Sequence, residues 1–295
     1  MTADGQELLA REFEAERPRL RAVAYRMLGS LSEAEDAVQD AWLRLSRTDT
    51  SEVENLTAWL TTVVARVALN MLRSRKTRRE ETLETRFPDP IIDPADGTDP
   101  EHEALLADSV GLALLVVLET LTPAERLAFV LHDMFAVPFD DIAPIVDRSP
   151  EATRQLASRA RRRVRGTAPT PDADLSAQWA VVDAFLAAAR EGDFDGLVAL
   201  LDPEIELRAD GGEVPGLTRH LRGAEAVASQ ATMWSRVNLT MRRALVNGAA
   251  GMVALRDGQP FSVMACTVRN GRIAEMDILA DPERVAQLDL TVLDG

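Results

Sequence analysis

The N-terminal part of the chain carries apolar residues at helical spacing. Within residues 58–75 they recur at i, i+3, i+4, i+7 and i+11, which places them on one face of a helix. These residues are Leu60, Val63, Val64, Val67 and Met71. A helix is also expected over about 32–47, where Ser32 and Glu35 stand at the spacing of a capping box. Residues 11–79 as a whole therefore predict a helical domain.

Residues 80–103 interrupt this pattern with four prolines, one glycine and many acidic residues. This composition is typical of an extended linker. Helical spacing resumes over residues 104–165. We expect the capping residues Thr122 and Glu125 to start a helix that runs to about Met134.

The end of this second helical segment has the spacing of a DNA-binding motif. A short helix is expected over 139–146, and Ser149 and Pro150 start the last helix after a turn of a few residues. Two helices joined in this way predict a helix-turn-helix. Its second helix would place the residues of its first turns in the major groove, where arginine pairs with guanine and glutamine with adenine.

Beyond a second linker, residues 166–174, the pattern changes type. Helices are expected over 175–191 and 194–201, followed by a strand at about 204–209, a glycine-rich loop and a helix over 223–235. The remaining segments alternate like strands and are separated by the turn pairs Asn-Gly, Asp-Gly and Asn-Gly. These strands are expected at about 238–247, 251–257, 260–269 and 272–279. Helices followed by antiparallel strands indicate an α+β domain.

Composition bounds the function classes. No apolar run approaches the roughly 20 residues of a membrane span, and the N-terminus has no signal-peptide pattern, so we expect a cytoplasmic protein without a membrane partner. Cys266 is the only cysteine, which excludes an internal disulfide and a zinc cluster. We expect no catalytic site, no metal and no cofactor.

The net charge of −15 hides an uneven distribution of charge. Residues 66–79 hold six basic residues and no acid, and residues 148–165 hold seven arginines against one acid. Two short basic segments in an acidic background indicate two separate surfaces that contact phosphates. The DNA-reading residues that we expect in the second segment are Arg148, Ser149, Thr153, Arg154, Gln155, Ser158, Arg159 and Arg162.

The stretch from Leu121 to Val164 resembles region 4 of the extracytoplasmic-function (ECF) sigma factors, which reads the −35 promoter element. YRMLGSLSEAEDAVQDAWLRL and AWLTTVVARVALNMLRSRKTRR are similar to region 2 of that family. The resemblance implies a multidomain fold with two all-α domains, residues 8–80 and 104–167, joined by an acidic linker, residues 81–103. An α+β SnoaL-like cone, residues 172–295, follows.

The resemblance also implies partners. Core RNA polymerase is expected to bind through its β′ clamp helices and β flap, and promoter DNA is the second partner. The residues implied in polymerase binding are Glu35, Asp36, Gln39, Asp40, Trp42 and Leu43. The loop 49–55 resembles the one that captures a flipped −10 base. The residues implied in −10 binding are Asn55, Arg66, Asn70, Arg73, Arg75, Lys76, Arg78 and Arg79.

The C-terminal part is similar to the SnoaL-like tail that a subgroup of these sigma factors carries. FPDPI (87–91) and DGGEVPG (210–216) stand where the subgroup has a Trp-Leu-Pro-Glu-Pro-Leu linker and an Asp-Gly-Gly-Gly-Lys loop. Phe87 replaces the tryptophan, and Glu213 stands near the place of the lysine with opposite charge. The residues implied in interdomain regulation are Phe87, Pro88, Pro90, Asp210, Gly211, Gly212 and Glu213.

The subgroup resemblance implies control in cis, in which the tail restrains the sigma regions and no dedicated anti-sigma factor is needed. An alternative is a sigma factor whose tail senses a small molecule, which predicts a sizeable pocket. A catalytic tail would in addition need a buried carboxylate facing that pocket. The candidate groups are Asp183, Asp210, Asp277 and His220. A helix-turn-helix repressor would leave residues 32–47 without a role.

Overall fold

The computed structural model describes residues 3–48, 53, 55–79, 87–97, 105, 111–167, 172, 174–234 and 237–290. The side chains of residues 3–6, 76–79, 166 and 167 are outside this description. The chain divides into two compact units. The first consists of Met1–Asp89, Pro100–Asp108 and Leu115–Thr167, and the second of Pro90–Asp99, Ser109–Leu114 and Ala168–Gly295. No helix within the described ranges is long and apolar enough to cross a membrane.

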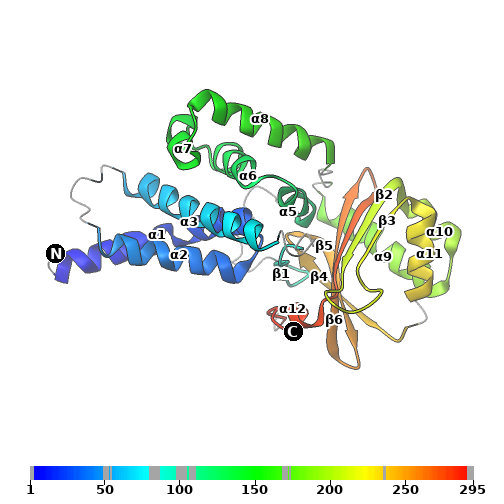
Figure 1. Cartoon of the computed structure of the whole chain (residues 1–295). Coiled ribbons are helices and arrows are strands. Elements are labelled where there is room, and N and C mark those ends of the chain that lie inside the picture. The colour runs from blue at the N-terminus through cyan, green and yellow to red at the C-terminus, as the bar shows by residue number, and fades with distance from the viewer. Residues whose placement is uncertain are drawn as a thin grey trace. The chain divides into compact units, whose positions relative to one another are not determined.

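The first helical domain consists of α1 (Ala3–Leu28), α2 (Leu31–Leu45) and α3 (Leu56–Arg79), drawn blue to cyan in Figure 1. The predicted apolar face of α3 is confirmed, since Leu60, Val63, Val64 and Val67 are buried. They pack against α1 and α2, whose own buried residues complete one core. The hydrophobic periodicity thus set the face of α3 that turns inward.

The predicted capping box at the start of α2 is wrong. The helix begins at Leu31, and its N-cap residue is Ser30, whose side chain makes no capping hydrogen bond. Glu35 instead forms ion pairs with Arg17 and Arg21 of α1. A carboxylate with two arginines on the neighbouring helix has stronger partners than a backbone N–H, which explains why the box does not form.

The second helical domain comprises α5 (Leu112–Glu119), α6 (Pro123–Phe129), the π-helical turn η2 (Val130–Met134), α7 (Phe139–Val146) and α8 (Pro150–Thr167). The predicted box at α6 is confirmed: the Thr122 hydroxyl accepts from Glu125 N at 3.3 Å, and Glu125 Oε2 accepts from Thr122 N at 3.2 Å. The helix predicted to run to about Met134 is α-helical only as far as Phe129, and the π-helical turn η2 continues it to Met134. Asp147, with φ +54°, turns the chain between α7 and α8.

Within the described residues, the sheet domain holds seven strands in the order β1-β4-β5-β6-β7-β2-β3. They are β1 (Ile92–Asp93), β2 (Leu201–Asp210), β3 (Arg219–Arg222), β4 (Thr240–Val246), β5 (Ala249–Arg256), β6 (Gln259–Arg269) and β7 (Arg272–Leu279). Neighbours are antiparallel except β2 and β7, which are parallel. The three predicted two-residue turns are confirmed, because both residues of each turn have positive φ.

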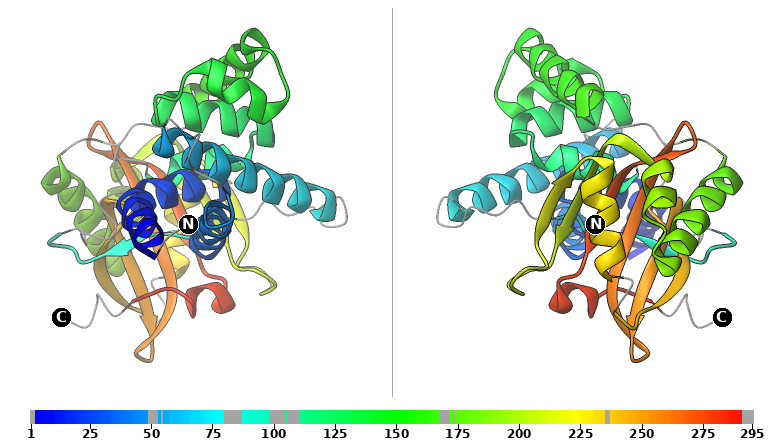
Figure 2. Two further views of the ribbon diagram at one scale, coloured as in Figure 1. Left: turned by 90° about the vertical axis from the view of Figure 1, so that its left-hand side faces the viewer. Right: turned by 90° about the vertical axis from the view of Figure 1, so that its right-hand side faces the viewer.

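Helices α9 (Leu175–Glu191), α10 (Phe194–Leu200) and α11 (Ala224–Trp234) lie on one side of this sheet (Figures 1 and 2), and the short α12 (Pro282–Val285) follows β7. The core beneath the three helices is apolar and includes Val182, Phe185, Leu197, Val227 and Met252. The fold class predicted from the sequence, two helical regions followed by an α+β cone, is confirmed.

Two strands were not expected. Strand β1 lies inside the segment 81–103, which the sequence analysis treats as linker throughout, and β3 follows the glycine-rich loop. Strand β2 also begins at Leu201, three residues before the expected start. Both missed strands are short and lie at the two edges of the sheet, where pairing with a distant strand, and not local propensity, decides the conformation.

Candidate nucleic-acid interface, linker contacts and sheet cavity

The second helix of the helix-turn-helix presents a polar face to solvent. The predicted DNA-reading residues that are exposed on this helix are Arg154, Gln155, Ser158, Arg159 and Arg162, and Arg148 and Ser149 are exposed just before it. The prediction that Thr153 reads DNA is wrong. Its side chain is fully buried (0% exposed), and its hydroxyl donates to Ser149 O at 3.0 Å. Thr153 shares the inward face of α8 with Leu156, Ala157 and Ala160, so it has no access to a base.

Several arginines of α8 are bound within their own domain. Arg159 Nε donates to Glu125 Oε1 at 2.9 Å, and Arg161 donates to Asp133 Oδ1 at 2.8 Å. Burial alone would raise the pKa of Glu125, but hydrogen bonds from Arg159 and Thr122 lower it below its usual value. Arg159 is therefore engaged by a charged partner within its own domain. Arg154 instead lies over the Phe139 ring, 5.6 Å from its centre.

Helix α3 presents a second basic face, on which Arg66, Asn70 and Arg73 are exposed. Arg75 was predicted to belong to this surface, but it is not part of the exposed face. Its side chain is 11% exposed, forms an ion pair with Glu33, and donates to Leu28 O at 2.9 Å, so it serves the packing of α3 on the first two helices.

Other parts of this predicted −10 surface are only partly described. The side chains of Lys76, Arg78 and Arg79 lie outside the described residues, as do residues 49–52 and 54 of the predicted base-capturing loop. Asn55, the last residue of that loop, is exposed, and its Oδ1 accepts from Ala58 N at 3.0 Å at the start of α3.

Helix α2 presents an acidic face with one exposed apolar side chain. Asp36 and Gln39 are exposed, and Leu43 is 43% exposed. Asp40 pairs with Arg44 at 2.9 Å. Trp42 is partly covered because it packs on the ring of Phe13, 5.0 Å between centroids. This face has the charge and the apolar anchor that suit a basic partner helix.

The two helical domains are joined by a buried polar contact. Arg126 of α6 is 2% exposed, and its Nε donates to the carbonyl oxygen of Arg26 in α1 at 3.0 Å. The same guanidinium forms an ion pair with Glu119 at 2.7 Å. A buried charge of this kind is stable only while its partners stay in place, so the contact ties the second helical domain to the first.

The beginning of the linker is bound to the first helical domain. Asp89 N donates to Gly29 O at 2.8 Å, and Asp89 Oδ2 accepts from Leu31 N at 3.2 Å. The Tyr25 hydroxyl donates to Asp89 O at 2.6 Å. Phe87 is buried within the same unit. Asp89 therefore caps α2 from outside the helix, a role that Ser32 was expected to fill.

The next linker residues belong to the sheet domain. Ile92 and Asp93 pair with Val246 and Leu245 of β4. Asn247 makes two hydrogen bonds to Ile91, the residue before β1. Its backbone N donates to Ile91 O at 2.8 Å, and its Oδ1 accepts from Ile91 N at 3.2 Å. Ile91 is 1% exposed, so this segment is an integral edge strand of the sheet.

The glycine-rich loop contacts the C-terminal end of the described chain. Asp210 Oδ2 accepts from Arg284 at 3.0 Å, and Asp210 Oδ1 accepts from Gly212 N at 3.0 Å. Gly212 has φ +57°, and a side chain there would also meet Asp281. Glu213 is exposed. The predicted regulatory contact between this loop and residues 87–90 stays a prediction.

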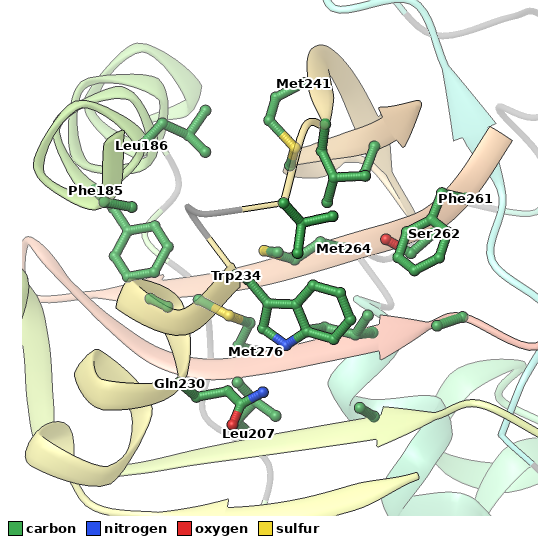
Figure 3. A pocket seen from close by; sticks show the side chains of 18 of the residues that line it. Phe185, Leu186, Leu207, Gln230, Trp234, Met241, Phe261, Ser262, Met264 and Met276 are labelled. Atoms are coloured by element: carbon green, nitrogen blue, oxygen red, sulfur yellow. The ribbon is translucent and has the colours of Figure 1, made fainter. Parts of the chain in front are cut away.

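A cavity of about 620 Å³ lies between the sheet and helices α9 and α11 (Figure 3). Its wall is mainly apolar and includes Phe185, Trp234, Phe261, Met264 and Met276. We refer to it as the sheet cavity. Its volume lies within the range of small-molecule sites.

The buried carboxylates of the sheet domain lie on the opposite face from the sheet cavity. Leu207 and Met276 line the cavity, and since strand residues alternate, Arg208, Glu275 and Asp277 point to the other side. Arg208 Nε donates to Asp277 Oδ1 at 2.8 Å, and Arg208 Nη2 lies 2.9 Å from Glu275 Oε2. Burial raises the pKa of Glu275 to about 7, and burial also raises that of Asp277, although Arg208 opposes both shifts.

The other carboxylate and imidazole candidates are also placed. Asp183 lines the sheet cavity and forms an ion pair with Arg243, which lines it as well. Asp210 holds Arg284, and His220 is exposed with Glu206 at 3.5 Å. Only Asp183 of the four candidates is in the cavity wall, and it has a charged partner. The arrangement therefore does not assemble the buried carboxylate that a catalytic tail requires.

Several residues that hold these sites were not singled out from the sequence. Glu119 and Arg126 join the helical domains, and Asn247 holds the linker. A charged pair inside an apolar helical segment is a usable signal, because such residues are rarely buried without partners. The sequence around Asn247 predicted a turn. It could not predict the hydrogen bond between Asn247 and Ile91 of the linker, because the two residues are 156 positions apart.

Comparison with known proteins completes the description. The family model of Sigma-70 region 2 matches residues 13–78, and that of Sigma-70, region 4 matches residues 111–164. The chain is 39% identical over 294 residues to the "ECF RNA polymerase sigma factor SigJ" of Mycobacterium tuberculosis, with 92% of each chain covered. It is 32% identical over 285 residues to the "Probable ECF RNA polymerase sigma factor SigI" of that species, with 94% of each covered.

A solved structure covers nearly the whole chain. The crystal structure of M. tuberculosis SigJ superposes with a TM-score of 0.76 at 36% sequence identity, and the match covers 95% of this chain and 99% of that one. The similarity thus extends through both helical domains and the sheet domain.

Proposed function

This chain belongs to the ECF sigma factors of RNA polymerase, and we propose that its sheet domain controls its activity in cis through the linker between the two sigma regions. As a sigma factor it directs RNA polymerase to specific promoters and initiates transcription. The first helical domain is sigma region 2 and the second is sigma region 4. Core RNA polymerase and promoter DNA are its partners, and the cytoplasm is where we expect it to work.

The exposed residues of α8 are proposed to read the −35 element. Arg154 and Gln155 lie in its first turns, where side chains enter the major groove, and Arg162 is placed for phosphates. The exposed residues of α3, Arg66 and Asn70 among them, are proposed to contact the −10 element.

The acidic face of α2 is proposed to bind the β′ clamp helices. The clamp partner would approach Asp36, Asp40 and the exposed Leu43. Charged rim groups speed and orient association, and a central apolar side chain supplies affinity. Region 4 is proposed to bind the β flap.

One observation supports cis control above the others: a strand of the sheet, β1, is supplied by the linker that joins region 2 to region 4. Three residues before β1, the same linker is hydrogen-bonded to region 2 through Asp89. A linker held at Asp89 and again at residues 91–93 restricts the positions that the two DNA-binding regions can take. Release of β1 would free them, and a ligand or partner that favours either state would shift the equilibrium.

Run-off transcription with core RNA polymerase tests this proposal. The full chain and a chain ending at residue 170 would be compared on the same genomic promoter fragments, with core polymerase alone as the control. Removal of the sheet domain is expected to change promoter-dependent transcription, because β1 loses the strand that holds it. Equal activity of the two chains at every promoter would refute cis control. Failure of both chains to stimulate core polymerase on any fragment would refute the proposed contacts with the polymerase and with promoter DNA.

Control in cis means that a dedicated anti-sigma factor is not required, and we propose that none acts on this chain. A catalytic tail is disfavoured by the placement of Glu275 and Asp277 behind the sheet, away from the sheet cavity. The cavity itself favours the sensing alternative.

A further inference from the structure

We propose that the sheet cavity binds an uncharged, mainly hydrocarbon small molecule that carries a carbonyl oxygen, and that this occupant acts on the linker through strand β4. The inference deepens the proposed cis control, on which its regulatory part rests. Binding itself does not depend on that control.

The size and the wall of the cavity fit such a molecule. A volume of about 620 Å³ equals that of roughly 20 water molecules in the liquid. Three aromatic rings and three methionines form much of the wall (Figure 3): Phe185, Trp234, Phe261, Met241, Met264 and Met276. Rings supply large contact areas and methionine thioethers adapt to the shape of a ligand. Filling this space would bury hydrocarbon surface that now faces the cavity.

The polar groups of the cavity wall favour an uncharged ligand with a hydrogen-bond acceptor over an anionic ligand. Gln230 is 8% exposed, and its Oε1 accepts from Arg219 at 3.1 Å. Because Oε1 is the accepting atom, the amide nitrogen Nε2 is the atom left to donate, and a carbonyl oxygen is its natural partner. The buried Ser262 hydroxyl is a second neutral group in the wall. A hydrogen-bonding group in an apolar wall fixes the orientation of a ligand.

The charges at the cavity are engaged by the protein. Arg243 pairs with Asp183, and its guanidinium also lies over the Trp179 ring at 5.3 Å. Arg190 Nε donates to Leu186 O at 3.2 Å and Arg219 Nε donates to Gly216 O at 2.8 Å. An anionic ligand would compete with Asp183 for Arg243, whereas an uncharged ligand leaves all of these contacts in place.

Strand β4 connects the cavity with the linker. Met241 and Arg243 line the cavity, and Leu245 and Val246, further along the same strand, pair with β1. Arg243 also joins β4 to α9 through Asp183. A ligand that spreads or tightens the wall would therefore move the strand that holds β1. Such a ligand shifts the release of the linker only as far as its affinity differs between the two states.

Titration with the fluorescent dye Nile red, which is uncharged and carries a carbonyl oxygen, tests binding on the full chain. We expect saturable binding at one site per chain. Ala189→Phe on α9 puts a ring into the cavity and is expected to reduce affinity at least tenfold. Ala184→Phe, on the solvent face of the same helix, is the matched control and is expected to bind like the original chain.

A second variant separates lost binding from lost folding. Gln230→Met keeps the length of the side chain and removes the amide, so a loss of about tenfold is expected for one hydrogen bond to the ligand. Circular dichroism and thermal unfolding would verify that each variant is folded. Dye that does not saturate, or that binds Ala189→Phe and Gln230→Met as tightly as the original chain, would overturn the site. Preferential binding of an anionic fatty acid over the uncharged dye would overturn the proposed ligand class.

The link to the linker has its own readout. Amide hydrogen exchange at residues 91–93 is expected to change at least threefold when Nile red saturates the cavity. Unchanged exchange with bound dye would refute the action through β4 while leaving the binding site intact. Cis control itself is judged by the truncation experiment, so failure of the proposed function and failure of this inference are distinguishable.

Discussion

Replacing Asn247 with glycine would remove one acceptor from the linker and leave the turn around it in place. Asn247 has φ +50° and Gly248 φ +75°, a backbone that glycine adopts without strain. The substitution deletes Oδ1, which accepts from Ile91 N at 3.2 Å. The backbone N of residue 247 still donates to Ile91 O. The change therefore acts on the hydrogen bond that precedes β1.

The size of the effect follows from burial. Ile91 is 1% exposed, so its N–H would lose its acceptor in a place that water does not reach. Leaving a buried donor without a partner costs about 1–3 kcal/mol, which corresponds to roughly 5- to 150-fold in the equilibrium between bound and released linker. The extra backbone freedom of glycine belongs to the unfolded chain, because the turn at residue 247 stays formed whether the linker is bound or released.

Two assays measure the outcome, with Asn270→Gly as the control. Asn270 has φ +53° in the turn before Gly271 and is exposed, so this variant has the same added backbone freedom without a linker contact. In Asn247→Gly we expect faster amide exchange at residues 91–93 and more run-off transcript than in the original chain. The reasoning fails if exchange at residues 91–93 is the same in both variants, or if exchange rises and transcription stays constant.

Three further predictions concern other contacts. Arg126→Met leaves the buried Glu119 without its partner and is expected to lower the free energy of unfolding by about 3–5 kcal/mol, measured by urea denaturation; a loss below 1 kcal/mol would contradict a buried ion pair. Burial raises the pKa of Glu275 from 4.5 to about 7, so folding retains a proton that the unfolded chain releases, and stability falls as pH rises through this window. Glu275→Gln is expected to remove this slope, which is at most about 1.4 kcal/mol per pH unit; an unchanged slope would assign the proton elsewhere. Arg154→Ala is expected to weaken −35 discrimination by about 1–3 kcal/mol in competition binding, and an unaltered base preference would show that this arginine does not read the element.

Local patterns predicted the elements whose conformation is decided within one or two turns of chain. The apolar spacing of α3, the Thr122–Glu125 box and the Asn-Gly turns all depend on neighbours within about eleven positions, and each is confirmed. Strand β1 could not be found in this way. It has two residues, it lies among prolines, and it is a strand only because Leu245 and Val246 pair with it.

In the candidate site too, some features follow from the local sequence and others depend on tertiary contacts. Thr153 was grouped with Arg154 and Gln155 because all three lie in the first turns of α8. Its spacing of three, four and seven positions from Leu156, Ala157 and Ala160, which also face inward, was not used. Arg75 was counted with the basic end of α3, and its burial follows from Glu33 on another helix. Charge counts locate a basic segment, whereas the partner of each arginine is decided by the tertiary structure.

The position of Gly29 limits which residue types this sigma factor can accept there. It has φ +64°, and its carbonyl oxygen accepts from Asp89 N. A β-carbon there would lie 2.6 Å from Glu119 Oε1 and 3.6 Å from the Cβ of Pro88. A β-carbon at position 29 would therefore press on the carboxylate that pairs with Arg126, at the contact between region 2 and region 4. Alanine there is expected to weaken this contact without deleting either partner, so glycine is required at this position by the packing of the two regions as well as by its own backbone conformation.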